Sequence, residues 1–272
     1  MSWITSRERA REGDLILLIG SKQKYFIFPL IQGGTFQTHR GIVNHDDLID
    51  QKWGSEIFSH KGSPFYIFQP GIEELIMTTK RNTQIMYAKD IGYLLLKLNI
   101  ISGAKVIEAG TGSGSITQVI AAVIGSEGHL YSYEVRPEMQ NLAKKNLKRL
   151  GVDIETRVTF IQKDIEDGFD QNNIDAIFLD VPNPCDYIEQ VKSALVPGGF
   201  FGTILPTTNQ IIKLLIELRR QQFAYIEVSE IMLRHYQAEA TKLRPTDRMV
   251  AHTGYLIFAR PITKSIKDKE EE

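Results

Sequence analysis

Hydrophobic residues are arranged differently in the two parts of the chain. Up to about residue 70, short apolar runs at residues 15–19, 24–28 and 65–68 are separated by turns that contain glycines such as Gly34 and Gly54. Short apolar runs bounded by turn residues predict strands. We therefore expect residues 1–70 to form a small N-terminal β domain.

From residue 106 onward, predicted strands alternate with segments of helical character. The strands are expected at residues 106–108, 130–134, 158–162, 175–180 and 200–205, and the helices at 137–150, 209–222, from residue 115 and up to residue 195. Such alternation is typical of an α/β domain with a parallel sheet covered by helices. Strands at 224–233 and 254–259 are candidates for an antiparallel edge. Residues 71–262 are assigned to this domain, and the charged tail 263–272 is predicted to be flexible.

Composition fits a folded protein without a membrane segment. Hydrophobic residues make up 42% and charged residues 24% of the chain, and no apolar run approaches the roughly 20 residues of a membrane span. The first residues lack the apolar core of a secretory signal, and Cys185 is the only cysteine, which together favour a cytoplasmic setting. The net charge of −1 neither favours nor excludes a nucleic-acid partner.

The most informative segment begins with the predicted strand at 106–108. Residues 106–115 read VIEAGTGSGS, an acidic residue followed by three alternating glycines. Glycines let the backbone turn sharply and approach a ligand, and the next helix directs unpaired N–H groups at it. A dinucleotide fingerprint also needs a glycine at the third place of G-x-G-x-x-G, which this run lacks. The pattern instead resembles motif I of class I S-adenosylmethionine (SAM) methyltransferases. The candidate cofactor residues in the loop are Glu108, Gly110, Gly112, Gly114 and Ser115.

Two further acidic residues suit the adenosine half of such a cofactor. Glu134 ends the predicted second strand about 20 residues on, where a carboxylate can accept hydrogen bonds from both ribose hydroxyls. Asp164 follows the third strand, where an acidic side chain commonly receives the adenine amino group in this fold. The alternative for Asp164 is a turn cap without a ligand. Together with the glycine loop, these residues predict a SAM site.

A second group of residues follows the predicted strand at 175–180. Asp180 stands at the carboxyl edge of the sheet, where open α/β folds hold ligands, and the sequence continues VPNP. The prolines on both sides of Asn183 restrict the backbone and favour a loop of fixed shape. Asp180 is therefore the candidate catalytic residue and also a candidate cofactor contact, with an ordinary structural turn as the alternative.

Longer segments make the resemblance more specific. The runs RNTQIMYAKD at 81–90, EAGTGSGSIT at 108–117, LDVP at 179–182 and RPTDRMVAHTGYL at 244–256 resemble the tRNA (adenine-N1)-methyltransferase family, which modifies adenine 58 of the T-loop, and GIVNHDDLI at 41–49 is similar too. The resemblance implies a Rossmann-like class I methyltransferase fold with a mostly parallel seven-stranded sheet and a small N-terminal β domain. It also implies SAM as cofactor, tRNA as substrate, a homotetramer and, in archaeal relatives, adenine 57 as a further target.

The chemistry of that reaction agrees with an aspartate at position 180. Adenine N1 carries a lone pair and no proton at neutral pH, so it can attack the sulfonium methyl without a general base, and positioning becomes the main requirement. A carboxylate that accepts from the N6 amine orients the base and stabilises its developing positive charge. The base must be extruded into a pocket, where aromatic rings can stack on it. The remaining site candidates are Gln84 for the cofactor and Tyr87, Tyr187, Tyr236, Arg244, Arg248 and His252 for the substrate.

Each of these candidates has a structural alternative, and other functions stay open. The tyrosines can be core aromatics, and the basic residues can cap or form interfaces. A protein methyltransferase of the isoaspartyl-repair kind shares the glycine loop but leaves residues 244–256 unexplained. A noncatalytic tRNA-binding subunit should have lost the loop or Asp180, and a nicotinamide-dependent oxidoreductase should have the missing glycine. No metal or membrane partner is expected.

Overall fold

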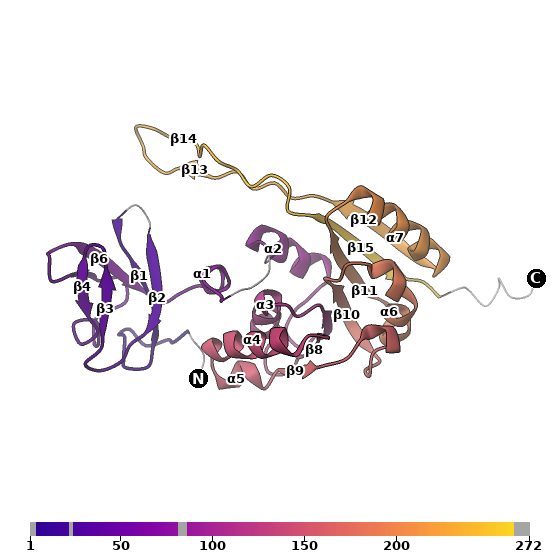
Figure 1. Cartoon of the computed structure of the whole chain (residues 1–272), viewed down its shortest axis with the longest axis horizontal. Coiled ribbons are helices and arrows are strands. Elements are labelled where there is room, and N and C mark those ends of the chain that lie inside the picture. Colours follow the sequence, from indigo (N-terminus) through magenta and orange to yellow (C-terminus); the bar gives the residue numbers. More distant parts are fainter. Residues whose placement is uncertain (1–3, 22–23, 81–85, 264–272) are drawn as a thin grey trace, which may run out of the picture. The chain divides into compact units, whose positions relative to one another are not determined.

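The computed structural model describes residues 4–21, 24–80 and 86–263, and the chain divides into two compact units (Figure 1). The first unit takes in the described residues up to Thr79 together with Arg149–Asp153, and the second takes in Lys80–Lys148 and the described residues from Ile154 onward. The predicted flexible tail lies outside the described residues from 264 onward.

The first unit is built on a four-stranded antiparallel sheet. Its strand order is β2-β1-β6-β5, and a hairpin of β3 and β4 and the short helix α1 complete the unit. The bounds are β1 (Leu15–Ile19), β2 (Tyr25–Pro29), β3 (Thr35–Thr38), β4 (Gly41–Asn44), β5 (Glu56–Phe58), β6 (Pro64–Phe68) and α1 (Ile72–Met77). Alternate residues such as Ile16 and Leu18 of β1 point into one core with Phe65 and Ile67 of β6. The expected small β domain is observed here, although β3, β4 and β5 are too short and polar for the sequence to predict them.

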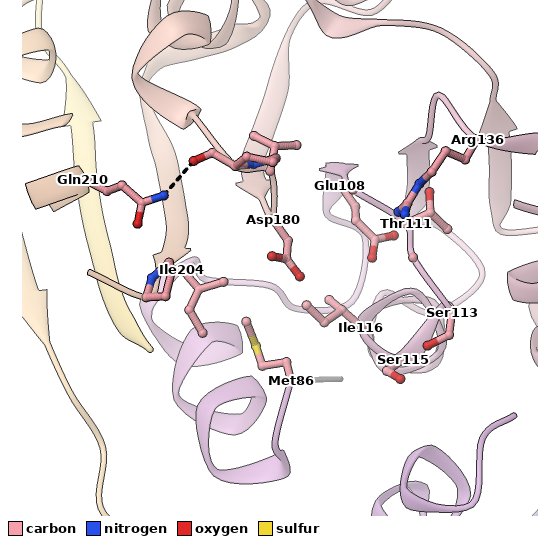
Figure 2. A pocket seen from close by; sticks show the side chains of 15 residues that line it. Met86, Glu108, Thr111, Ser113, Ser115, Ile116, Arg136, Asp180, Ile204 and Gln210 are labelled. Atoms are coloured by element: carbon pink, nitrogen blue, oxygen red, sulfur yellow. Dashed lines mark hydrogen bonds between the residues drawn. The ribbon is translucent and has the colours of Figure 1, made fainter. Parts of the chain in front are cut away.

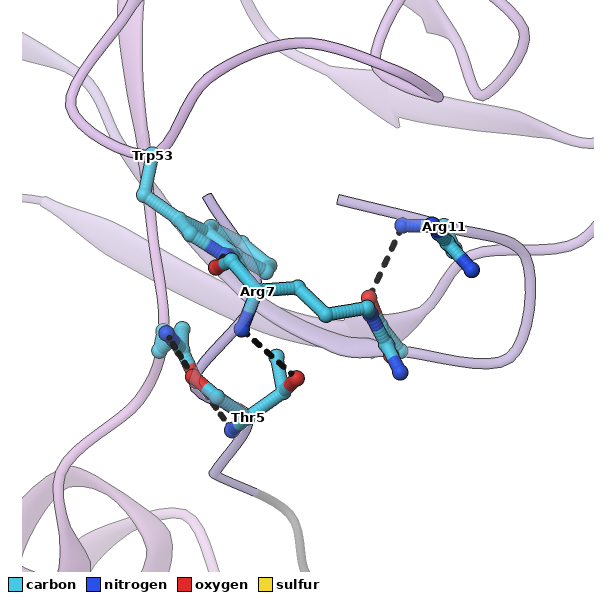
Figure 3. A network of polar contacts seen from close by, with 6 residues as sticks. Thr5, Arg7, Arg11 and Trp53 are labelled. Carbon is cyan, nitrogen blue, oxygen red and sulfur yellow. Dashed lines mark hydrogen bonds and ion pairs between the residues drawn. The ribbon is translucent and has the colours of Figure 1, made fainter. Parts of the chain in front are cut away.

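Polar contacts fasten the start of the chain to this sheet (Figure 3). The Thr5 N–H donates to Gln69 Oε1 at 2.6 Å, and Gln69 Nε2 donates back to the Thr5 carbonyl at 2.9 Å. The Trp53 indole N–H donates to the Arg7 carbonyl at 3.0 Å, and the Arg7 guanidinium pairs with Asp14. Segments far apart in the sequence are therefore joined within the first unit.

The second unit contains a seven-stranded sheet of order β12-β15-β11-β10-β7-β8-β9. Strands β9, β8, β7, β10 and β11 run parallel, whereas β15 is antiparallel to β11 and β12. The bounds are β7 (Lys105–Ala109), β8 (His129–Tyr133), β9 (Val158–Ile161), β10 (Ile174–Leu179), β11 (Leu195–Leu205), β12 (Phe223–Ser229) and β15 (Tyr255–Pro261). This confirms the predicted class I methyltransferase architecture, including its antiparallel edge.

Helices cover the sheet and join its strands. Their bounds are α2 (Ala88–Lys97), α3 (Ser115–Val123), α4 (Pro137–Leu147), α6 (Ile188–Ala194) and α7 (Thr208–Arg220), and the short α5 (Val152–Glu155) is divided between the two units. Ile188 of α6 and Leu214 of α7 belong to the same buried cluster as Ile107 of β7 and Ile177 of β10. No helix in the described part of the chain is both long and apolar enough to cross a bilayer.

Several predicted boundaries differ from the structure. The helix expected at 137–150 is α-helical only to Leu147 and ends in a 3-10 turn at Lys148–Leu150. The strand expected at 224–233 ends at Ser229. The chain then forms a projecting hairpin of β13 (Tyr236–Gln237) and β14 (Arg244–Pro245), which the sequence did not predict (Figure 1).

A buried polar cluster connects helix α2 to the segment before β15. Lys89 Nζ lies 2.7 Å from Asp90 Oδ1 and donates to Thr253 Oγ1 at 2.7 Å, and the Thr253 hydroxyl donates to Asp90 Oδ2 at 2.8 Å. Asp90 has no exposed surface and the Lys89 side chain is 7% exposed. The cluster therefore joins the two segments, 81–90 and 244–256, that carried the family resemblance.

We expect Thr253→Val to reduce the free energy of unfolding of the second unit by about 1–3 kcal/mol, because it removes one hydrogen bond from each of two buried charged groups, Lys89 and Asp90. Chemical denaturation followed by circular dichroism measures this change. The matched control is Thr241→Val at an exposed position, which should leave the transition unchanged. Equal midpoints for the two variants would contradict a stabilising role for the cluster.

Candidate functional site

The candidate site lies where the connections of the sheet change direction. From β7 the chain crosses through α3 to β8, whereas from its neighbour β10 it crosses through α6 to β11 on the other side. Open parallel sheets hold ligands in the crevice that such a switch point leaves at the carboxyl ends of the strands. A cavity of about 460 Å³ is found there, lined by the glycine loop, the loop after β10 and the start of α7 (Figure 2).

Gly110 allows the loops after β7 and β10 to touch. Its φ is +95°, and a Cβ at this position would stand 2.1 Å from the carbonyl oxygen of Asp180. The Asp180 N–H in turn donates to the Ala109 carbonyl at 2.8 Å. A side chain at position 110 would collide with fixed backbone, so this glycine sets the position of Asp180 as well as the shape of the ligand loop.

Gly114 serves the packing of two helices. It precedes α3 with a φ of +81°, and a Cβ there would lie 2.8 Å from the Cβ of Ala143 on α4. The buried Asn146 of α4 donates from Nδ2 to the Ser113 carbonyl at 2.8 Å. Helix α4 therefore supports the glycine loop through the packing of Ala143 and the hydrogen bond of Asn146.

Ser115 begins helix α3 and lines the cavity. Its hydroxyl is buried and has no hydrogen-bond partner among the described residues. A buried polar atom without a partner is rare in folded proteins and needs an explanation. A helix N-terminus with a free hydroxyl is suited to hold a negatively charged group of a ligand.

Glu108 is buried at the base of the cavity and held by hydroxyls. Thr117 Oγ1 and Ser132 Oγ each donate to Glu108 Oε2 at 2.7 Å. Burial raises the pKa of Glu108 and the two hydroxyls oppose this effect; with the further contribution of the Asp180 and Glu134 carboxylates, the pKa is raised to about 7. An acidic group this close to neutrality favours a positively charged neighbour.

Glu134 is buried as well but stays ionised. Its Oε2 accepts from the Gly112 N–H at 3.0 Å and Arg136 Nη2 at 3.2 Å, and its Oε1 accepts from the Arg136 backbone N–H at 3.1 Å and Nε at 3.0 Å. Burial alone would raise the pKa of Glu134, but the hydrogen bonds from Arg136 and Gly112 outweigh it and lower the pKa.

A smaller cavity of about 160 Å³ shares Gly110 and Pro182 with the first and is also lined by Glu134, Asp164 and Tyr187. Asp164 accepts from the Glu166 N–H at 3.0 Å, so it caps a 3-10 turn and faces a cavity at the same time. The turn cap is therefore observed, and the contact of Asp164 with the adenine amino group stays a prediction. Tyr187 lies on this side, next to Asp164, and not in the larger cavity with Asp180.

Asp180 directs its carboxylate into the larger cavity, on the side where Met86, Ile116 and Ile204 lie (Figure 2). Solvent reaches the side chain through the cavity, but the surrounding protein atoms remove much of its hydration. This desolvation, and then the Glu134 carboxylate, raise the pKa of Asp180 from 3.8 to about 6. Asp180 is thus an acceptor near neutral pH with apolar side chains around it.

The structure does not bring the remaining predicted substrate residues into the cavity. Tyr87 is half-buried directly before α2, next to the cavity residue Met86. Tyr236, Arg244 and Arg248 are exposed and lie on the projecting hairpin or next to it. The predicted cofactor residue Gln84 lies outside the described residues.

His252 does not line the cavity but forms a hydrogen bond with a residue that does. Its Nδ1 lies 2.7 Å from Glu230 Oε1 and its Nε2 lies 3.1 Å from the carbonyl of Pro206, which lines the cavity. Both partners are acceptors, so the two bonds together require the protonated imidazolium. The hydrogen bond to Glu230 raises the pKa of His252, and the Pro206 carbonyl acts in the same direction.

The cavity residues that the sequence analysis missed include Gln210 and Arg136. Gln210 in the first turns of α7 donates from Nε2 to the Pro182 carbonyl at 3.0 Å and accepts from Thr207 Oγ1 at 2.7 Å, which fixes the loop after Asp180 (Figure 2). Arg136 reaches the cavity from two positions after Glu134. The sequence offered only weak signals for these residues, a threonine cap three positions before Gln210 and the run Glu-x-Arg after β8.

Comparisons with known proteins agree with this geometry. A family model described as "tRNA methyltransferase complex GCD14 subunit" matches residues 64–248, and one described as "TrmI-like N-terminal" matches residues 10–57. A tRNA (adenine(57)-N(1)/adenine(58)-N(1))-methyltransferase TrmI from Methanocaldococcus jannaschii is 34% identical over 87% of this chain and 91% of its own length. The tRNA (adenine(58)-N(1))-methyltransferase TrmI of Thermus thermophilus is 29% identical over 91% and 96%.

Two solved structures are similar over nearly the whole chain. A SAM-dependent O-methyltransferase from Thermotoga maritima has a TM-score of 0.89 and 38% identity, covering 95% of this chain and 96% of that one. The tRNA (m1A58) methyltransferase TrmI from Aquifex aeolicus has a TM-score of 0.81 and 35% identity, covering 94% and 100%. The fold, the site and these relatives lead to one conclusion: the chain belongs to the TrmI family of tRNA (adenine-N1)-methyltransferases.

Proposed function

We propose that this protein transfers a methyl group from SAM to N1 of adenine 58 in the T-loop of tRNA. The observation that carries the proposal is the position of Asp180, whose carboxylate faces the same cavity as the glycine loop of the switch point. The relatives named for this reaction support the acceptor, since their resemblance covers both units of the chain.

The residues of the site fit SAM. The unpartnered Ser115 hydroxyl at the start of α3 suits the carboxylate of its methionine part, and the buried Glu108 suits the positive charge of the ligand. Glu134 and Asp164 would serve the ribose and the adenine from the smaller cavity. When bound, SAM supplies an activated methyl group on a sulfonium.

Asp180 would position the target adenine by accepting a hydrogen bond from the N6 amine. This bond strengthens as N1 gains positive charge, so it stabilises the transition state more than the bound substrate. Gln210 contributes by fixing the Pro182 carbonyl and with it the loop that follows Asp180. Met86, Ile116 and Ile204 exclude water and offer apolar surface to the base.

The other functions considered have less support. A noncatalytic subunit would not need both the glycine loop and an aspartate in the cavity, and this chain has both. The similar structure named as an O-methyltransferase leaves an oxygen acceptor as the second candidate. An oxygen acceptor must lose a proton during methyl transfer, whereas adenine N1 carries none. Nucleoside analysis distinguishes 1-methyladenosine from an O-methylated product in a single assay.

We further propose a cytoplasmic homotetramer that binds tRNA. Overall neutrality does not oppose this, because an oligomer can join modest basic patches into one surface. The archaeal relative named for adenines 57 and 58 makes adenine 57 a second possible target to be mapped.

The direct test is methyl transfer from SAM to unmodified tRNA, followed by digestion and nucleoside analysis. We expect 1-methyladenosine, mapped to position 58. Product as 2′-O-methylated nucleosides would favour the oxygen-acceptor alternative. A folded protein that binds SAM but forms no 1-methyladenosine would overturn the proposal.

We expect Asp180→Asn and Asp180→Ala to retain SAM binding but reduce kcat/KM for tRNA by about 10²–10³-fold, the usual cost of losing one stabilising contact in the transition state. Calorimetry measures the first quantity and the methylation assay the second. Asp186→Ala, at an exposed position in the turn Pro184–Tyr187 that follows the loop, is the control and should keep full activity. Unchanged turnover of the Asp180 variants would remove this residue from the mechanism.

The pH dependence should follow the raised pKa of Asp180, about 6. Protonated Asp180 is a weaker acceptor for N6 and has lost the negative charge that stabilises the developing positive charge on the base, so we expect kcat/KM to fall as pH drops below about 6 and to level off above it. Glu108, with a pKa of about 7, could contribute to the same pH profile. The variant Glu108→Gln removes that contribution, and its kcat/KM should still fall below about pH 6. A profile that stays flat to pH 5 would contradict the role of Asp180.

A further inference from the structure

The carboxylate of Glu134 has no hydrogen-bonding capacity left in the chain itself. A carboxylate offers about four acceptor positions, and the four bonds from Gly112 and Arg136 occupy them. Two of these donors are backbone N–H groups held by the loop and by the start of α4. The other two, Nε and Nη2, belong to the Arg136 guanidinium.

The guanidinium is the part of this arrangement that can move. The Arg136 side chain is 50% exposed, whereas the Glu134 side chain is 3% exposed. Among the described residues, Glu134 is its hydrogen-bond partner, and the side chain also borders the larger cavity. Backbone donors cannot leave without unfolding the loop, but an exposed side chain can rotate into solvent.

We propose that Arg136 is a positioning residue that competes with the ribose of the cofactor for Glu134. The inference rests on the proposed function, because it assumes that SAM is the ligand. Two ribose hydroxyls need two acceptor positions on Glu134, and they gain them by replacing Nε and Nη2. Without a ligand, the guanidinium keeps the buried carboxylate paired and ionised, which preserves the glycine loop through Gly112.

The exchange has a consequence for the acceptor side of the site. Arg136 borders the cavity that holds Asp180, so a guanidinium released from Glu134 becomes a free cation at that cavity. A free arginine can contact an RNA phosphate. Binding of the cofactor would thus free the Arg136 guanidinium to contact a phosphate of the tRNA.

The test compares ligand binding by the full chain and by Arg136→Met, which keeps most of the aliphatic stem and removes every donor. Because SAM is positively charged, removal of any nearby cation could tighten its binding. The titrations therefore use S-adenosylhomocysteine and adenosine, which carry no net charge, at pH 8, where Glu134 is ionised. Calorimetry gives the dissociation constants.

We expect Arg136→Met to bind both ligands about tenfold more tightly than the unaltered chain, and Arg136→Lys to fall between them, since it keeps the charge without the paired donors. The gain should vanish for 2′,3′-dideoxyadenosine, which lacks both hydroxyls. Arg219→Met on the exposed end of α7 is the matched control and should bind like the unaltered chain.

A second measurement is made on the unaltered chain and uses a variant only to assign the signal. The unaltered chain is labelled with ¹⁵N-arginine, and the NMR signal of the Arg136 Nε–H is assigned by its absence in Arg136→Met. We expect this Nε–H to exchange faster with water when S-adenosylhomocysteine is added. A purely structural pair would keep its protection.

Unchanged or weaker binding by Arg136→Met, an equal gain with the dideoxy ligand, or a protected Nε–H in the complex would each overturn the inference. If the unaltered chain methylates tRNA, the proposed function survives any of these results. If the unaltered chain binds neither SAM nor S-adenosylhomocysteine, the proposed function fails and the inference fails with it.

Discussion

The close approach of Gly110 to the backbone of Asp180 is the constraint on which the site depends. Neighbouring parallel strands end at the same edge of a sheet, but a side chain between the loops that follow them would keep the two backbones apart. Gly110, after β7, has no side chain and lets the loop after β10 come close, since a Cβ would stand 2.1 Å from the Asp180 carbonyl. Ligand loop and acceptor carboxylate are therefore placed by one contact.

Three carboxylates lie near this contact, and each has a different environment and a different shift of its pKa. Burial raises the pKa of Glu108 to about 7 despite two hydroxyl donors, whereas hydrogen bonds from Arg136 and Gly112 lower the pKa of Glu134. Asp180 faces the cavity with a pKa of about 6. Like charges so close together are costly unless cations or donors compensate them. A ligand with a positive sulfonium, and a base that becomes positive during the reaction, are the partners that such a site favours.

The elements that the sequence predicted well were those with strong local signals. The strand before Glu108, the proline that opens α4 and the alternation of strands and helices follow from short-range patterns. Elements with weak local signals were missed: β3, β4 and β5 of the first unit are short, and the hairpin of β13 and β14 has no apolar alternation. The helix end at Leu147 and the strand end at Ser229 also differ, because boundaries depend on neighbours that the local sequence does not contain.

By itself, the sequence determined the class of the fold, the family and the two loops that meet at the switch point, since glycines, acidic residues and prolines at strand ends carry local chemical meaning. Only the tertiary structure decided which residues share a cavity. It placed Tyr187 beside Asp164, left Arg244 and Arg248 outside, and brought in Arg136 and Gln210. The reason is physical: spacing along the chain sets which way a strand or helix presents a side chain, but the packing of separate elements sets which side chains meet.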